Sequence, residues 1–495
     1  MISLTDRQTT TLIAAANAAP PTAARSPQVK PVLSARMVTD LIITGYACVL
    51  ALLGTVAAKV GSERAAAGAL EPVLDSAVVG FVAATFVLIC IGVLEIDLRV
   101  LQTFTPALRQ MITAFAGTLI VVSLIASLIS ASSTYAGLTI WAWFFSGCGG
   151  LAVLHGTVAP CLRASRTIRE LTARRVAIVR GDDRTCARFL DLLCAQKEAD
   201  VDLVGVFQVT TRRRHAAAPG SGRSLEDLVA LAQERRIDEV FLALPWHAEK
   251  RISSLVDRLA HLPIDLKLCP DRVGYAQTLM VDERLAGVPI ATLHRQPIRD
   301  WGRVAKRAID LIVGATALAL LALPLALIAL AIKLDSPGPV LFRQQRQGFD
   351  HNVFELLKFR TMRYDPDALF VQARPDVRRV TRLGRWLRRT SLDELPQLLN
   401  VLHGEMSLVG PRPHAVALNA AFMRRIQRFA TRHRVKPGIT GLAQVNGWRG
   451  QTDTEEKMAG RVRNDLYYIE HWSLMLDLKI MARTVLTGFA HRNAY

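Results

Sequence analysis

The sequence of 495 residues predicts a membrane α plus α/β protein with a four-helix transmembrane bundle, a Rossmann-like doubly wound α/β domain, and a re-entrant membrane helix that leads into a mainly α domain. The length exceeds what one compact domain usually holds. Hydrophobic residues make up 51% of the chain although its formal net charge is +19, so apolar segments must be separated from strongly basic ones. The 7 cysteines show no CxxC or Cys/His zinc spacing, so we expect them to be reduced and structural.

Changes in composition divide the chain into segments. Met1–Lys30 is rich in Ala, Thr and Pro and lacks the apolar core of a signal peptide, which predicts a disordered cytoplasmic tail over residues 1–36. The following segments are a transmembrane domain at 37–162, an α/β domain at 163–293, a linker at 294–308, a re-entrant helix at 309–334 and a last domain at 335–495.

The transmembrane domain is predicted from apolar stretches that are each long enough to cross roughly 30 Å of hydrocarbon as a helix. These stretches are Val38–Val60, Ala77–Ile96, Met111–Ser130 and Leu138–Pro160. Basic residues precede the first stretch, separate the second from the third and follow the fourth, for example Arg36, Arg99 and Arg163. Basic loops remain on the cytoplasmic side, so the N-terminus and everything after Arg163 are predicted to lie inside the cell.

The α/β domain is predicted from short runs of β-branched and apolar residues that alternate with helical stretches such as Ser224–Arg236. The runs are Val176–Gly181, Val201–Phe207, Asp238–Leu244 and Ile264–Leu268. This alternation is typical of a parallel, doubly wound sheet. After the first run a dinucleotide-binding domain carries GxGxxG, whereas this chain has Gly181 alone, which favours a structural or regulatory role over NAD binding.

A fifth apolar stretch, Leu311–Ile332, has basic residues on both sides and Pro324 near its centre. Two basic flanks indicate that both ends stay in the cytoplasm, so the segment must enter the bilayer and return. Pro324 removes one backbone hydrogen bond and clashes with the preceding turn, which lets a helix bend there. An ordinary fifth span with a tolerated proline is the alternative.

Basic residues clearly outnumber acidic ones after Trp301, which indicates an anionic partner. Nucleic acid is not expected, because the basic region follows a membrane segment and carries no recognisable nucleic-acid motif. Anionic lipid headgroups of the bilayer and phosphorylated substrates fit this charge better.

Adjacent carboxylates at Asp393 and Glu394 directly follow a cluster of arginines in the run Arg388–Gln397. One interpretation is a capping box between Ser391 and Glu394 at a helix N-terminus. Such a terminus also binds phosphate, so Asp393 is a candidate nucleophile on phosphorus and Glu394 a candidate ligand for Mg²⁺. Arg388 and Arg412 could then hold the phosphoryl oxygens.

Further polar segments are candidates for phosphate or substrate binding. The stretch Lys358–Met362 places two cations and a hydroxyl close together, Val409–Pro413 is a stiff loop that carries Arg412, and Pro437–Arg449 is rich in turns. The candidate side chains in these stretches are Lys358, Arg360, Thr361, Gln444, Asn446 and Arg449.

The stretch from Arg303 to Phe489 resembles the catalytic module of the bacterial polyprenyl-phosphate hexose-1-phosphate transferases, the monotopic phosphoglycosyl transferase family. The matching segments are Asp335–Val340, Lys358–Met362, Ser391–Gln397, Ser407–Pro413, Lys436–Gly447 and Asp465–Ile469. The transmembrane and α/β domains ahead of it look like those of the large form of the family. The resemblance makes residues 335–495 a phosphoglycosyl transferase catalytic domain.

The resemblance implies a ping-pong reaction in which Asp393 is the covalent nucleophile, Glu394 a Mg²⁺ ligand, and Arg388 and Arg412 hold phosphate. It also implies a re-entrant helix broken at Pro324, although some members carry Ser where this chain has Leu323. The expected enzyme transfers hexose-1-phosphate from a UDP-hexose, UDP-glucose or UDP-galactose, to undecaprenyl phosphate, as the first membrane step of exopolysaccharide, capsule or O-antigen synthesis.

The expected location is the bacterial inner membrane, with the catalytic domain on the cytoplasmic side. A non-catalytic membrane scaffold that regulates a polysaccharide assembly complex is the alternative function. The identity of the hexose, a ligand of the α/β domain and a homodimer are left open by the sequence.

Overall fold

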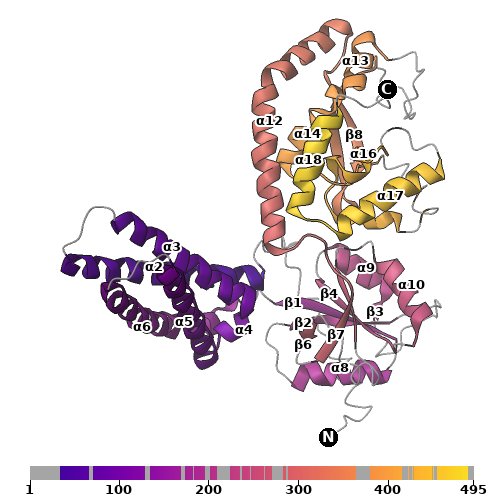
Figure 1. Cartoon of the computed structure of the whole chain (residues 1–495). Helices are drawn as coiled ribbons and strands as arrows, with labels where there is room; N and C mark the ends of the chain where they lie inside the picture. Colours follow the sequence, from indigo (N-terminus) through magenta and orange to yellow (C-terminus); the bar gives the residue numbers. More distant parts are fainter. Residues whose placement is uncertain are drawn as a thin grey trace. The chain divides into compact units, whose positions relative to one another are not determined.

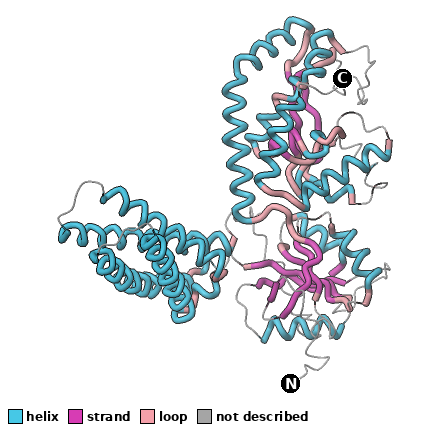
Figure 2. The backbone as a smooth tube through the Cα atoms, in the orientation of Figure 1, coloured by secondary structure: helices cyan, strands magenta, loops and turns pink. Residues whose placement is uncertain are grey.

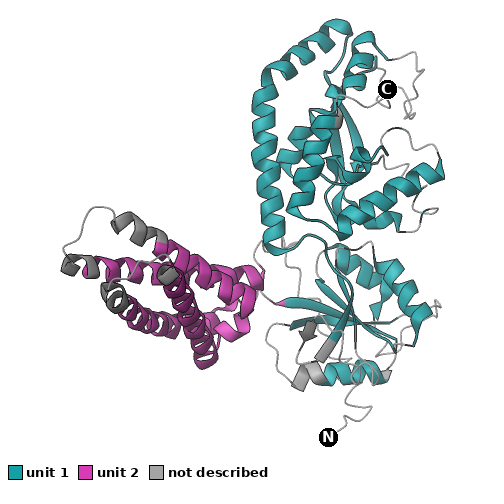
Figure 3. Cartoon of the chain, viewed as in Figure 1, with its two compact units in different colours: residues 1–27, 174–495 teal, residues 28–173 magenta. Residues whose placement is uncertain are grey.

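The computed structural model describes residues 34–65, 71–128, 134–168, 173–181, 183–195, 201–208, 223–234, 237–245, 247–260, 262, 264–269, 283–285, 288–363, 380–414, 422, 426, 428–448, 450 and 454–488. The chain forms two compact units, residues 28–173 and residues 1–27 with 174–495 (Figure 3). Most of the predicted N-terminal tail and the candidate Arg449 lie outside the described residues.

The membrane unit is a bundle of the helices α2 (Ala35–Ala65), α3 (Glu71–Leu88), α5 (Phe104–Leu128) and α6 (Thr134–Ala164), with a π-helical turn η1 (Ile89–Val93) and the short helix α4 (Leu98–Leu101) between α3 and α5 (Figure 1). Tyr46, Phe86, Phe115 and Trp143 pack in its core. Leu52, Leu88, Phe145 and Val153 are exposed on its outside, as expected for side chains that face lipid.

The hydropathy of the sequence located the membrane helices, but one of them is shorter than predicted. Of the described helices, α2, α5, α6 and a later helix, α12, are long and apolar enough to cross a membrane, whereas the second predicted stretch is a shorter apolar segment, Val78–Val93. That segment continues from α3 into the π-helical turn η1.

The α/β domain is built on a sheet, whose strands are magenta in Figure 2. The order of the strands in this sheet is β3-β2-β1-β4-β5-β7-β6. The four predicted strand runs form β1 (Arg174–Arg180), β2 (Val201–Gln208), β4 (Glu239–Ala243) and β5 (Asp265–Leu268). These strands pair in parallel, as does the short β3 (Arg223–Ser224), while β7 (Val288–His294) and β6 (Glu283–Leu285) add an antiparallel edge.

Helices cover both faces of this sheet because successive residues of β1 point to opposite sides. Val176 and Ile178 pack with α8 (Asp183–Ala195), whereas Ala177 and Val179 pack with α9 (Leu225–Gln233) and α10 (Glu249–Leu259). The predicted helical stretch is α9, whose N-terminus is closed by a capping box between Ser224 and Asp227.

Helix α12 (Asp300–Asp335) is a single helix with Pro324 in its interior, and its C-terminal part is curved (Figure 1). It begins at Asp300, so most of the predicted linker at 294–308 is helical. The charged residues at this end of the helix do not form an exposed linker. Lys306 and Asp310 are buried in the domain that follows.

The C-terminal domain combines an antiparallel hairpin, β8 (Leu341–Gln347) and β9 (Val353–Phe359), with a parallel pair, β10 (Ser407–Val409) and β11 (Gly438–Thr440). Its longer helices are α13 (Arg382–Thr390), α17 (Glu455–Glu470) and α18 (Leu474–Gly488). Between them lie the short helical segments η3 (Phe349–His351), η4 (Leu392–Glu394), α14 (Gln397–His403), η5 (Phe429–Arg434) and α16 (Leu442–Val445).

Candidate active site

The carboxylates of the sequence motif lie in the short 3₁₀ helix η4, between α13 and α14. Helix α13 ends at Thr390, and the next residue, Ser391, adopts a left-handed backbone conformation (φ 60°). The predicted capping box is wrong, because the Ser391 side chain caps no helix and α14 starts after Pro396 without a side-chain cap. The tertiary contacts of Glu394 take the place of that local bond.

Glu394 is held by two cations that reach it from different parts of the domain. Lys358 Nζ on β9 lies 2.7 Å from Oε1, Arg412 Nη1 donates to Oε2 at 3.0 Å, and Arg412 Nη2 donates to Oε1. Burial by itself would raise the pKa of Glu394, but Arg412 and Lys358 outweigh it and hold that pKa well below its usual range. Glu394 is therefore a fixed anion that orients both cations.

Asp393 is half-buried beside this cluster and differs from its neighbour. Among the described residues no hydrogen-bond donor contacts its carboxylate. Burial and the negative charge of Glu394 raise its pKa to about 6, against the opposing effect of Lys358, Arg388 and Arg412. A partly exposed carboxylate without a bound donor, facing three cations, keeps Asp393 a candidate nucleophile on phosphorus.

Arg388 and Thr361 meet next to the acidic pair. Arg388 Nε on α13 donates to Thr361 Oγ1 at 2.9 Å. Helix α13 passes directly over the Thr361 backbone, since a Cβ on Gly384 would lie 2.1 Å from the Thr361 carbonyl oxygen. Burial lowers the pKa of Arg388 and the charge of Asp393 opposes this shift, so the guanidinium is a poorly hydrated cation ready to bind an anion.

The strand that carries Lys358 is fixed by a buried amide. Asn400 on α14 accepts a hydrogen bond from Leu357 N at 3.0 Å and donates to Glu355 O at 2.7 Å. Helix α14 begins just after η4, so η4 and α14 together position Lys358 against Glu394. The Asn400 amide binds both a backbone N–H and a backbone carbonyl of β9. The strand is therefore fixed, and Lys358 on it has little freedom to move.

The loop that carries Arg412 is held through its main chain. The parallel pair β10 and β11 brings Gly410 and Gly438 so close that a Cβ on Gly438 would lie 2.1 Å from Gly410 N. Arg432 donates to the Arg412 carbonyl at 3.0 Å, and Arg346 to the Pro413 carbonyl at 3.1 Å.

Sequence reasoning missed both of these positioning arginines. Arg432 is also bound to the buried Asp465 at 2.7 Å, and burial, reinforced by Arg412, lowers the pKa of Arg346 to about 10. Asp465 is part of the motif Asp465–Ile469, which was the one sequence signal that pointed to this arrangement of arginines around the Arg412 loop.

Arg360 has a different environment from Lys358, although the two were predicted together. Its guanidinium donates to Ser336 O and Pro337 O, both at 2.6 Å. These are backbone atoms just after α12, so in this structure Arg360 closes the C-terminal end of the membrane helix.

The remaining candidates are not brought to the acidic pair by any hydrogen bond within the described residues. Gln444 is buried and donates to Ile439 O at 3.3 Å. Asn446 is exposed and donates to Asn464 at 2.8 Å. Their roles remain predictions.

Mg²⁺ fits this site only together with a substrate. In the part of the chain that the structure describes, no three His, Cys, Asp or Glu side chains are grouped so that they could hold a metal ion by themselves. Mg²⁺ is typically held by one or two carboxylates and substrate phosphates, which Asp393 and Glu394 can supply. Lys358 and Arg412 both donate to Oε1 of Glu394 and only Arg412 donates to Oε2, so a lone pair of Oε2 remains for an ion.

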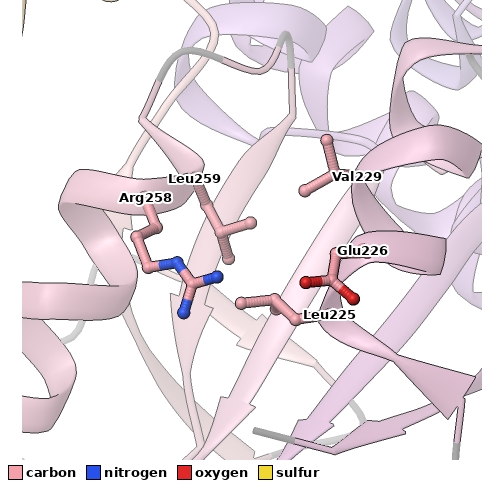
Figure 4. Close-up of a pocket in the computed structure, with 5 residues that line it drawn as sticks. All are labelled: Leu225, Glu226, Val229, Arg258 and Leu259. Atoms are coloured by element: carbon pink, nitrogen blue, oxygen red, sulfur yellow. The ribbon is translucent and has the colours of Figure 1, made fainter. Parts of the chain in front are cut away.

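A small pocket in the α/β domain has a different character (Figure 4). It lies between α9 and α10 and is lined by Leu225, Glu226, Val229, Arg258 and Leu259. None of the predicted site residues lines it. After β1 the Gly181 position is also closed, because a Cβ there would lie 2.3 Å from the Leu244 side chain.

Two family models match different parts of the chain. Residues 301–491 match the family model described as bacterial sugar transferase, and residues 96–270 match that of a CoA-binding domain. The chain is 40% identical over 367 residues to the UDP-glucose:undecaprenyl-phosphate glucose-1-phosphate transferase of Escherichia coli K12, which covers 72% of this chain and 77% of that protein. The chain belongs to the bacterial sugar transferase family.

Two further relatives differ in the sugar in their names and in the number of residues that align with this chain. The protein of the same name from Xanthomonas campestris is 36% identical over 361 residues, 71% of this chain and 74% of that protein. A UDP-N-acetylgalactosamine-undecaprenyl-phosphate N-acetylgalactosaminephosphotransferase from Aeromonas hydrophila is 41% identical over 192 residues, 38% of this chain and 45% of that protein. The transferase region is thus shared by relatives named for different sugars.

Proposed function

We propose that this protein transfers a hexose-1-phosphate from a UDP-hexose to undecaprenyl phosphate at the inner membrane, giving undecaprenyl-diphosphate-hexose and UMP. The observation that carries the proposal is the half-buried Asp393 beside Glu394, Lys358, Arg388 and Arg412. The relatives named as UDP-glucose:undecaprenyl-phosphate glucose-1-phosphate transferases favour glucose as the sugar.

In the first half-reaction an oxygen of Asp393 attacks the sugar-bearing phosphorus of the donor. The bond between this phosphorus and the bridging oxygen breaks, and UMP leaves with the electron pair. Lys358, Arg388 and Arg412 hold the phosphoryl oxygens as charge develops on them. In the second half-reaction the phosphate of undecaprenyl phosphate attacks the same phosphorus, and the Asp393 carboxylate leaves unchanged.

Bound Mg²⁺ would neutralise pyrophosphate oxygens and so assist the departure of UMP. Glu394 is the carboxylate we assign to it, through the lone pair that remains on Oε2. In the absence of substrate the two cations keep Glu394 ionised.

The packing of α12 supports a re-entrant rather than a spanning helix. Near its start Lys306 donates to Val409 O at 3.0 Å and pairs with Asp477 at 2.7 Å, and near its end Ile332 packs with Phe359 and Leu387. Both ends are therefore tied to the same domain. Together with the basic flanks, this packing supports our proposal that the catalytic domain lies on the cytoplasmic face, where nucleotide sugars occur, and favours a re-entrant helix over an ordinary fifth span.

UMP release by the purified protein in nanodiscs, measured against a panel of UDP-sugars, tests the function. We expect release with UDP-glucose that requires both Mg²⁺ and undecaprenyl phosphate for repeated turnover. A folded protein that binds nucleotide sugars but releases no UMP from any of them would instead be the non-catalytic scaffold. Exopolysaccharide, capsule or O-antigen synthesis is the pathway class that would consume the lipid product.

A further inference from the structure

We propose that Arg434 is a further positioning residue for the transfer reaction, through which the α/β domain holds the loop that carries Arg412. Arg434 lies in η5 of the catalytic domain and binds the end of β7 in the α/β sheet. The α/β domain carries none of the predicted site residues, and this contact gives it a role at the active site. The consequence for turnover rests on the proposed function, whereas the contacts themselves do not.

Arg434 is 4% exposed and uses two nitrogens of its guanidinium on the α/β domain. Nη1 donates to Nε2 of His294, and Nη2 donates to the carbonyl oxygen of Arg295 at 2.9 Å. Burial and the charges of Arg434 and Arg428 lower the pKa of His294 to about 3, so its ring stays neutral and Nε2 can accept the bond. A planar guanidinium bound to two acceptors restrains η5 against β7 in both distance and direction.

The end of β7 is itself fixed by the sheet. His294 is the last residue of β7 and pairs with β5 across the antiparallel edge. Just beyond it, Gln296 N donates to Asp265 Oδ1 at 2.8 Å, and Arg299 pairs with the same carboxylate. Asp265 is the first residue of β5. Arg434 therefore binds a part of the α/β domain that is held in place by strand pairing and by this carboxylate.

The other side of η5 reaches the active site. Arg432, two residues before Arg434, is buried, donates to the Arg412 carbonyl at 3.0 Å and pairs with Asp465. Arg412 in turn donates to both oxygens of Glu394. Because η5 is one short 3₁₀ helix, a shift at Arg434 also moves Arg432 and the loop that Arg432 holds. Small displacements of a group that holds the reacting phosphate slow a reaction strongly.

Arg428 offers a matched comparison at the start of the same helix. It pairs with Glu470 at 2.8 Å, and both side chains of this pair are exposed on the catalytic domain. Replacing Arg428 therefore removes the same charge from the same element but leaves the two bonds of Arg434 to the α/β domain intact.

Hydrogen–deuterium exchange of the full-length protein in nanodiscs tests the positioning without relying on activity. In Arg434→Gln we expect the backbone amides of Ser407–Pro413 to exchange about tenfold faster than in wild type, while those of α18 keep the wild-type rate. Arg428→Gln should leave both rates unchanged. Wild-type exchange of Ser407–Pro413 in Arg434→Gln, or an equal rise throughout the catalytic domain, would overturn the proposal.

A double-mutant cycle links the contact to turnover per folded molecule. His294→Leu should lower kcat/KM for UDP-glucose about threefold and Arg434→Gln about tenfold, because Arg434→Gln also loses the bond to the Arg295 carbonyl. The double variant should lose no more than about tenfold, since both changes remove the same bond between the domains. A loss of roughly thirtyfold, the product of the single effects, would mean independent roles and overturn the proposal.

Two further variants separate positioning from a general loss of packing. Arg434→Lys can still donate to one of the two acceptors, so it should lose only about threefold in kcat/KM. Thr292→Val on β7 removes a hydroxyl that makes no hydrogen bond within the described residues, and should keep the wild-type value. A loss in Thr292→Val as large as in Arg434→Gln would contradict the inference. Faster exchange of Ser407–Pro413 in Arg434→Gln, with no UMP release by wild-type protein, would contradict the proposed function alone.

Discussion

Two glutamates with little exposed surface, Glu239 and Glu394, have the same kind of partners and different neighbours. In the α/β sheet Glu239 binds Lys267 at 2.9 Å and Arg174 at 3.3 Å. In the catalytic domain Glu394 binds Lys358 at 2.7 Å and Arg412 at 3.0 Å. Each cluster has a second carboxylate beside it. Asp265, the cross-strand neighbour of Glu239, is paired with Arg299 and accepts a hydrogen bond from Gln296 N, whereas among the described residues Asp393 accepts none, and burial and the charge of Glu394 raise its pKa to about 6.

The comparison teaches that a paired buried glutamate is not by itself a sign of catalysis. Both clusters satisfy their charges and hold elements of structure together. The chemistry is expected where a further carboxylate is kept without a donor among the same cations. The following predictions separate these two roles.

Asp393→Asn should give the largest loss, lowering UMP release by roughly 10⁴-fold, because an amide cannot form the acyl phosphate. The fold should persist. The raised pKa means that ionised Asp393 destabilises the folded state as pH rises from about 4 through about 6, so the variant should have a higher apparent Tm than wild type at pH 7.5. Wild-type turnover in this variant would exclude Asp393 as the nucleophile.

Glu394→Gln should lower turnover by about 10²- to 10³-fold, since Lys358 and Arg412 lose the anion that orients them. The dependence on Mg²⁺ should change at the same time. Because the charge of Glu394 contributes to the raised pKa of Asp393, the acid limb of the pH–rate profile should move to lower pH. An unaltered acid limb would show that the two carboxylates are not coupled.

The pH–rate profile of the wild-type enzyme should show a smaller effect. The nucleophile must be ionised, so kcat/KM should fall about tenfold for each pH unit below about 6. Initial rates of UMP release between pH 4.5 and 8, with stability checked at each pH, measure this. A flat profile down to pH 5 would mean that Asp393 keeps an ordinary pKa.

Lys267→Met should leave turnover per folded molecule almost unchanged and destabilise the α/β domain by about 3–5 kcal/mol, because Glu239 is left buried with one cation fewer. Thermal unfolding and UMP release normalised to folded protein test both parts. Lost turnover at unchanged stability would place this cluster in the catalytic machinery and break the comparison.

Much of the architecture could be predicted because its signal is local. The apolar stretches gave the helices α2, α5, α6 and α12, and the β-branched runs gave the parallel strands β1, β2, β4 and β5. The length of an apolar stretch and the spacing of its apolar residues depend only on residues close together in the chain, so the sequence shows them directly.

The errors and omissions arise where distant segments meet. The capping interpretation of Ser391 and Glu394 considered only local bonds, whereas Glu394 is satisfied by Lys358 and Arg412 from other elements. Arg346 and Arg432 were missed for the same reason, since their acceptors are the backbone carbonyls of Pro413 and Arg412. No pattern in the sequence encodes a bond to a main-chain atom far along the chain.

The most direct test of the central claim is mass spectrometry of the catalytic peptide after wild-type protein in nanodiscs is mixed with UDP-glucose and quenched without undecaprenyl phosphate. We predict a peptide that contains Asp393 heavier by one hexose phosphate, absent in Asp393→Asn and removed on addition of undecaprenyl phosphate. No such adduct under any quench, while UMP release with both substrates continues, would contradict a covalent role for Asp393.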